Sequence, residues 1–144
     1  MEVKHASHCT YRIRYHMVFV VKYRKKMFMN NIPISFLKDL LLEIGDRYFF
    51  EFDAIGIESE HFHIVVCASP KYSPSRIMQI IKSITARMIF KEFPEIRKQL
   101  WGGQFWHDGG HIDTVSEFGG LDTIKKYVLE QGRKNDQLKL DSYL

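Results

Sequence analysis

Apolar residues switch between strand-like and helix-like spacing along the chain, and the order of these switches most constrains its fold. Residues 10–23, 48–57 and 61–68 are rich in aromatic and β-branched residues, with alternation clearest in the first, which predicts three strands. Apolar side chains recur at a helical period from Pro33, which is well placed to begin a helix, to about Tyr48, and again over about 75–93. Short strand pieces follow at 104–107 and 111–115, and a last helix is expected over 121–132.

The succession strand, helix, strand, strand, helix, strand predicts an α+β fold: a ferredoxin-like β-α-β-β-α-β sandwich (RRM-like) with an additional C-terminal helix. The chain has 144 residues, so we expect a single domain over 1–144. Its core would span about 9–118, a Gly-Gly hinge would lie at 119–120, and a polar tail would cover 133–144. Because this fold hosts many unrelated functions, it does not by itself indicate one.

Composition excludes several classes of protein. Hydrophobic residues make up 45% of the chain and charged residues 26%, which excludes a disordered chain. The longest clear apolar runs, Met17 to Val21 and Ile64 to Ala68, are too short to span a bilayer, so no membrane partner is expected. The N-terminus lacks a signal-peptide pattern, and Cys9 and Cys67 do not form a disulfide framework. We therefore expect a cytoplasmic protein.

Positive charge is concentrated in two stretches. No acidic residue occurs between Glu2 and Asp39, or from His61 to Lys91, although the net charge is only +4. Such segments favour a polyanionic partner, since phosphate neutralisation dominates nucleic-acid affinity, and the interleaved tyrosines could stack on unpaired bases. A solvated basic face without a partner is the alternative. The residues expected to bind DNA are Arg12, Arg14, Lys22, Arg24, Lys25, Lys26, Lys82 and Arg87.

A His-Phe-His sequence begins the strand predicted at 61–68. Alternate residues of a strand share a face, so His61 and His63 point the same way and could hold one divalent metal ion with a third ligand from elsewhere. The alternative is a pair of surface histidines. Histidine-triad hydrolases also use alternating histidines, but Val65 stands where they need a third.

Tyr127 and Gln131 are four residues apart and so are neighbours on one face of the last predicted helix. A tyrosine hydroxyl can attack a phosphodiester if a metal stabilises the developing charge, and a glutamine carbonyl is a suitable ligand for Mg²⁺ or Mn²⁺. Taken alone, the pair is better explained without catalysis, with Tyr127 as an aromatic residue of the core and Gln131 as a surface residue.

Taken together, these features resemble the single-tyrosine HUH transposases of the IS200/IS605 insertion sequences. The resemblance spans nearly the whole chain. Its matching segments are Tyr15 to Phe19 with Lys22 to Lys26, His61-Phe62-His63, Lys82-Ser83 through Arg87, Thr114-Val115, and the helix with Tyr127 and Gln131. Two departures are Glu60, where the family usually has aspartate, and the stretch Ser116-Glu117-Phe118. The change at Glu60 could alter metal affinity through a neighbouring ligand.

The resemblance implies a DNA transposase. His61, His63 and Gln131 would hold one Mg²⁺ or Mn²⁺ ion, and Tyr127 would attack single-stranded DNA to form a 5′-phosphotyrosine and release a 3′-OH. It also implies binding of subterminal DNA hairpins and a homodimer in which the tyrosine helix of one subunit can complete the site of the other.

Three alternatives remain at this point. A domesticated relative that processes repeated palindromes would use the same residues but usually carries terminal extensions. A non-catalytic single-strand-binding module of RRM type would not need His61, His63 and Tyr127 together. Rolling-circle initiators and relaxases share the chemistry but are generally larger.

Overall fold

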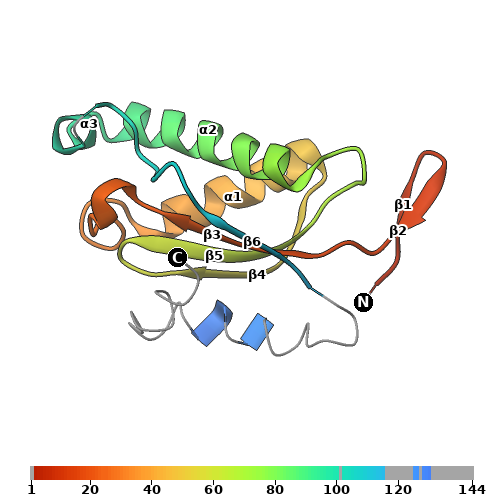
Figure 1. The fold of residues 1–144 in the computed structure, drawn as a ribbon. Helices are drawn as coiled ribbons and strands as arrows, with labels where there is room; N and C mark the ends of the chain where they lie inside the picture. Colours follow the sequence, from red (N-terminus) through yellow and green to blue (C-terminus); the bar gives the residue numbers. More distant parts are fainter. Residues whose placement is uncertain (1, 101, 116–124, 127, 131–144) are drawn as a thin grey trace.

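One antiparallel sheet organises the molecule. The computed structural model describes residues 2–100, 102–115, 125–126 and 128–130. Its strands are β1 (Lys4–Ala6), β2 (Cys9–Tyr11), β3 (Tyr15–Val20), β4 (Glu51–Ile57), β5 (His61–Cys67) and β6 (His111–Thr114). The last four pair antiparallel in the order β4-β5-β3-β6, whereas β1 and β2 form a separate hairpin beside the main body (Figure 1).

The helices are α1 (Ile34–Tyr48), α2 (Pro74–Glu92) and the short α3 (Ile96–Gln99), with a 3-10 turn η1 at Lys22–Arg24. α1 follows Pro33, and Phe49 ends it in a left-handed conformation with its N–H donating to the Gly45 carbonyl. α2 begins where the Ser73 hydroxyl accepts the Arg76 N–H, a standard N-cap. It ends just before Pro94, which cannot continue a helix.

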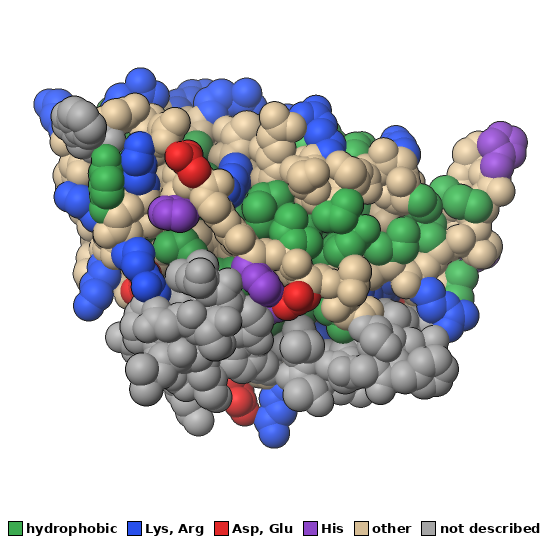
Figure 2. Space-filling view, viewed as in Figure 1, with side chains coloured by type: hydrophobic (Ala, Val, Ile, Leu, Met, Phe, Trp, Pro, Cys, Tyr) green, Lys and Arg blue, Asp and Glu red, His purple; other side chains and the backbone are tan. Residues whose placement is uncertain are grey.

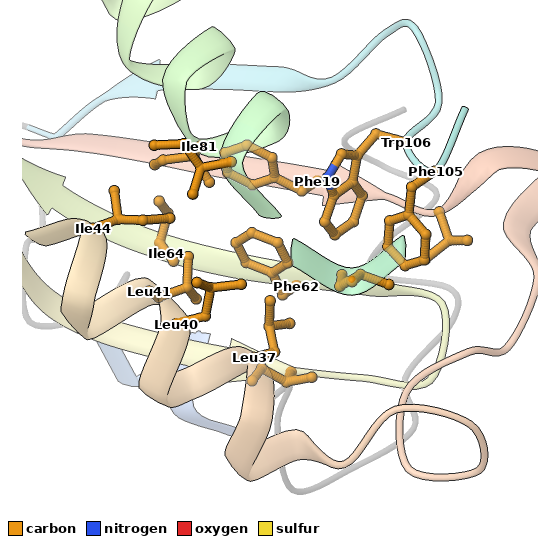
Figure 3. Packing of buried hydrophobic residues seen from close by; sticks show 14 of the residues in the cluster. Phe19, Leu37, Leu40, Leu41, Ile44, Phe62, Ile64, Ile81, Phe105 and Trp106 are labelled. Carbon is orange, nitrogen blue, oxygen red and sulfur yellow. The ribbon is translucent and has the colours of Figure 1, made fainter. Parts of the chain in front are cut away.

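The hydrophobic core lies between one face of the sheet and the helices α1 and α2 (Figure 1). Phe19 and Phe62 stack at 4.4 Å between ring centroids, and both are fully buried. Figure 3 shows these rings between the α1 leucines, Ile81 of α2 and the indole of Trp106. Large apolar side chains on alternate strand residues therefore fix which face of the sheet meets the helices.

The opposite face of the sheet meets the C-terminal helical segment (Lys125, Lys126 and Val128–Glu130; Figure 1). Val128 is fully buried there against Ala54 of β4 and Val65 of β5. The sheet is thus covered on both faces, by α1 and α2 on one and by this segment on the other.

A β-bulge interrupts β4. Phe52 pairs with Val66, but Ala54 pairs with Val65, so Asp53 is an extra residue in the ladder. Its carboxylate accepts a hydrogen bond from the guanidinium of the buried Arg14.

The structure is a mixed α+β fold with helices and strands in the predicted order, and α1, α2, β4 and β5 lie close to their predicted ranges. The single strand predicted over 10–23 was wrong. Residues 12–14 belong to no strand, and β2 pairs with β1 in the separate hairpin, so the segment divides into β2 and β3. The strand expected at 104–107 is only an isolated bridge between Val21 and Trp106.

The hairpin β1–β2 and the helix α3 were not predicted. The hinge at 119–120, the tail at 133–144, and residues Tyr127 and Gln131 lie outside the described residues. None of the helices among the described residues combines the length and apolar character needed to cross a membrane.

Candidate metal and nucleic-acid site

His61 and His63 lie on the face of β5 that is turned away from α1 and α2. Their partners on β3 are Val20 and Val18, whereas Phe62 points into the core on the other face. Both histidines are buried, at 1% and 0% exposure. The strand spacing correctly placed the two rings on one face, but the alternative of exposed surface histidines was wrong, because both faces of the sheet are covered.

Glu60 holds the first histidine in a defined orientation. His61 Nδ1 donates a hydrogen bond of 2.8 Å to Glu60 Oε1, and the Ser59 hydroxyl donates one of 2.8 Å to Oε2. Burial raises the pKa of Glu60, but the two hydrogen bonds and the nearby Arg24 charge together lower it by more. The net shift of this pKa is therefore downward. Glu60 is therefore an ionised acceptor that fixes a proton on His61 Nδ1.

His16 of β3 contacts the second histidine. His16 Nε2 and His63 Nδ1 are 3.0 Å apart, and the rings are stacked at 5.3 Å between centroids. If His63 Nδ1 is the donor, its Nε2 carries the lone pair needed to bind a metal. The position of His16 in the middle of a predicted strand favours a packed or DNA-facing residue over a metal ligand, and in the structure this residue is fully buried. The sequence does not indicate its contact with His63, since this contact depends on how β3 and β5 pair.

Burial keeps these imidazoles neutral. Desolvation, with smaller contributions from His61, His16 and His111, lowers the pKa of His63 to about 2. Desolvation also lowers the pKa of His16 to about 4. A neutral imidazole is the form that coordinates a metal ion, so both rings are in that form at neutral pH.

The donor set fits a divalent cation. His61 Nε2 is buried and accepts no hydrogen bond from any described residue, while its other nitrogen is held by Glu60. This carboxylate–imidazole arrangement is the usual support for a metal-binding histidine. Within the described residues, no three His, Cys, Asp or Glu side chains converge as a complete ligand set. A third ligand must therefore come from another residue type or another part of the chain.

The sequence did not indicate that His111 and Asp113 of β6 lie on the same face as the histidine pair. In the β3–β6 ladder Asp113 is the partner of His16 and His111 the partner of Val18, so both are on the same face as His16. Their side chains are joined by a 2.6 Å contact between Nε2 and Oδ2. The His16 and His111 rings are 6.3 Å apart. Pairing across strands, rather than any local pattern, extends the histidine row from β5 to β6.

The expected DNA-binding residues fall into two groups. Arg12, Arg24, Lys25, Lys26 and Arg87 reach the surface to differing extents, and Figure 2 shows Lys and Arg side chains along the α2 edge and at the end of the molecule with η1. Lys22 donates to Gln104. Arg14 is 4% exposed and paired with Asp53. Lys82 Nζ donates to three backbone carbonyls, those of His107, Asp108 and Gly109. A phosphate contact by Arg14 or Lys82 would have to displace these bonds; their DNA-binding roles stay predictions.

Residues 9–131 match the family described as Transposase IS200 like, so the chain belongs to that family of DNA transposases. Two curated proteins that resemble the chain are also named transposases. The chain is 29% identical, over 93% of this chain and 94% of the relative, to the ISDra2 transposase TnpA of Deinococcus radiodurans. It is 26% identical, over 95% and 90%, to the transposase for insertion sequence element IS200 of Salmonella typhimurium.

Solved structures agree on the fold. A crystal structure described as a transposase from Deinococcus radiodurans R1 superposes with a TM-score of 0.71 at 26% identity, covering 90% of this chain and 97% of that one. A REP-associated tyrosine transposase bound to a REP hairpin superposes with a TM-score of 0.60 at 14% identity, covering 90% and 75%.

Proposed function

We propose that this transposase cuts and rejoins single-stranded DNA through a covalent bond to Tyr127, assisted by one Mg²⁺ or Mn²⁺ ion. His61, His63 and Gln131 would hold the ion. When bound, the ion would act as a Lewis acid on the scissile phosphate. The observation that carries the proposal is the buried pair His61 and His63, each with Nδ1 in contact with a neighbouring side chain that can fix its tautomer.

In the proposed reaction the Tyr127 oxygen forms a bond to phosphorus and the bond from phosphorus to the 3′ oxygen breaks. The tyrosine loses its proton and the released 3′ oxygen gains one, which leaves a 5′-phosphotyrosine and a free 3′-OH. A 3′-OH can later attack a phosphotyrosine junction and release the tyrosine. The phosphoester is retained in the covalent intermediate, so rejoining needs no external energy source.

A covalent-adduct assay tests this proposal. Labelled single strands from each end of the element are incubated with the protein and Mn²⁺ and separated on a denaturing gel. We expect a protein–DNA band that disappears in Tyr127→Phe and His63→Ala and persists in Tyr48→Phe, a matched change at a half-buried tyrosine of α1. Tight hairpin binding without an adduct from any strand would instead favour a non-catalytic binding module.

We propose further that the exposed basic residues bind DNA hairpins. The solved relative bound to a REP hairpin supports this substrate class, as do the cluster Lys22 to Lys26 and the exposed Tyr23. Removal of one lysine that neutralises a phosphate should reduce the salt dependence of binding by about one unit in the log–log slope. Lys25→Ala and Lys26→Ala should therefore flatten that slope, whereas Lys38→Ala on α1 should not.

We propose a homodimer in which the tyrosine helix can act in the partner's site. An edge strand, β6, and an apolar groove of about 490 Å³ beside it support a subunit contact. The groove includes Met78, Phe90 and Ile112, and Figure 2 shows hydrophobic side chains gathered between α2 and β6. Light scattering should give a mass near twice 17.1 kDa for the wild type. Ile112→Asp, which puts a charge in the groove, should lower that mass toward the monomer value. A monomeric mass for the wild type would contradict the dimer.

The strand order and the two helices on one face also support assigning the fold to the ferredoxin-like class. β3, β4, β5 and β6 are the first to fourth strands of a β-α-β-β-α-β unit, and they lie in the order second, third, first, fourth.

A further inference from the structure

Gly56 lies directly beneath the backbone of the C-terminal helical segment. A Cβ atom built on Gly56 would overlap the carbonyl oxygen of Val128 and lie 2.9 Å from its carbonyl carbon. Real Cβ atoms essentially never approach another atom so closely. The backbone of the helical segment therefore rests on the strand itself, and no side chain larger than hydrogen fits between them.

The residues around Gly56 on this face of the sheet have short side chains. Ala54 and Val65 are direct partners in the β4–β5 ladder, and with Val128 they form a separate buried cluster on this face. We name Ala54, Gly56 and Val65 the helix seat. Its residues are small or β-branched, so Val128 packs against them while its backbone meets Gly56.

The helix seat adjoins the histidine pair. Gly56 is the ladder partner of His63. Val128 directly follows Tyr127 in the chain, and Gln131 lies three residues beyond it. Docking of Val128 on the helix seat would therefore constrain the two residues near it in the sequence that are proposed as nucleophile and third metal ligand.

We propose that Gly56 is a positioning residue for catalysis. It has no side chain, and this lets the tyrosine helix dock directly beside His63. The inference rests on the proposed function and adds the docking position of the tyrosine helix. If the subunits exchange helices, the seat of one subunit would receive Val128 of the other in the same way.

Gly56→Ala is the direct test, with Gly109→Ala as the matched control. A Cβ at Gly109 would meet only the side chain of the exposed His107, at 3.2 Å, which can move. Misplacement of a reacting group by about 1 Å can cost about 100-fold in rate. We expect Gly56→Ala to reduce adduct formation by about that factor with hairpin binding and the circular dichroism spectrum unchanged, and Gly109→Ala to retain activity. Near-normal adduct formation by Gly56→Ala would overturn the proposal.

Mixing variants distinguishes a positioning role from general damage. Gly56→Ala retains Tyr127, whereas Tyr127→Phe retains an intact seat. If the helix docks on its partner's seat, mixed dimers of the two inactive variants regain adducts. If it docks on its own subunit's seat, they do not, and Gly56→Ala lowers only its own subunit's activity in mixtures with wild type. Activity lost from both subunits of such a mixture would contradict positioning.

A double-mutant cycle covers the case in which Gly56→Ala is unstable, and it does not depend on catalysis. Val128→Asp places a charge at a fully buried position and should release the helical segment from the seat. Gly56→Ala should then cost no further thermal stability in the Val128→Asp background, because the helix backbone that the new methyl group would clash with has already moved away. An equal loss in both backgrounds would show that Gly56 serves the strand alone. Absence of any wild-type adduct would reject the proposed function while leaving this test of docking intact.

Discussion

His61 and His63 are held by two different kinds of neighbour. Glu60 is an anion that accepts from His61, whereas His16 is a neutral ring in contact with His63. A carboxylate makes the ring that it supports more basic, so the two metal-binding nitrogens should differ in strength. Removing either support should weaken metal binding without removing a ligand.

His16→Phe keeps a ring of similar size in the buried position but removes the nitrogen that contacts His63 Nδ1. Loss of such a partner typically costs about 10–100-fold in metal affinity. We therefore expect Mn²⁺ binding, measured calorimetrically or by electron paramagnetic resonance, to weaken within that range. His8→Phe, a change at an exposed histidine, is the control. Unchanged affinity in His16→Phe would mean that His63 needs no partner.

Glu60→Gln keeps the shape of the side chain and an acceptor oxygen but removes the charge. The His61 ring then becomes a weaker donor to the ion, and we expect Mn²⁺ affinity to fall by about 10-fold. Glu43→Gln on the exposed side of α1 controls for loss of one negative charge. A Glu60→Gln protein that binds Mn²⁺ as tightly as wild type would contradict a role for the carboxylate charge.

Among the elements, α2 organises the segment that leads into β6. Thr85 of α2 accepts the indole N–H of Trp106 at 2.8 Å, and both side chains are buried. Three residues earlier, Lys82 donates to three consecutive backbone carbonyls from His107 to Gly109. One face of α2 therefore supports the segment from Trp106 to Gly109, which leads into β6.

Thr85→Val tests this support. The substitution removes the acceptor and leaves the buried indole N–H of Trp106 unsatisfied, which costs about 1–3 kcal/mol. Urea unfolding should show a loss of free energy in that range, and Thr10→Val on the exposed β2 strand should change little. A loss no larger than that of the control would mean that the indole finds another acceptor.

Long elements with a clear period could be predicted from the sequence, and short ones could not. The apolar stripes of α1 and α2 and the buried run of β5 carry their own signal. β1, β2 and α3 have three or four residues each, and their existence depends on contacts with the rest of the fold. Likewise, the alternation of a strand put His61 and His63 on one face. The meeting of His16 with His63 required the pairing register, which no local pattern contains.

At the scale of the whole molecule, the neutral buried imidazoles make stability depend on pH. The pKa of His16 falls from 6.5 to about 4 on folding, because burial disfavours its charged form. Below pH 6.5 the unfolded chain binds a proton that the folded protein does not, so its contribution to stability is complete above pH 6.5 and is lost as pH falls toward 4. Over that window His16 alone should account for about 3 kcal/mol.

Urea unfolding in the presence of EDTA from pH 7 to pH 4 measures this contribution. We expect wild-type stability to fall steeply across the window and His16→Phe to lose less, because one of the titrating groups is gone. Equal slopes in the two proteins would show that His16 does not titrate differently in the folded and unfolded chains.

The bulge at Asp53 decides which residue of β4 lies opposite His63. If there were no bulge and Asp53 paired with Val65 in a regular ladder, Ile55 would lie opposite His63 and Gly56 would turn toward the core. The bulky Ile55 would then stand where the helix backbone now rests. The strand should accordingly be sensitive to any change of length between the bulge and Gly56. Deleting Asp53 would only close the bulge and leave Gly56 opposite His63, whereas deleting Ile55 would move Gly56, the attachment point of the tyrosine helix, to the wrong side of the sheet.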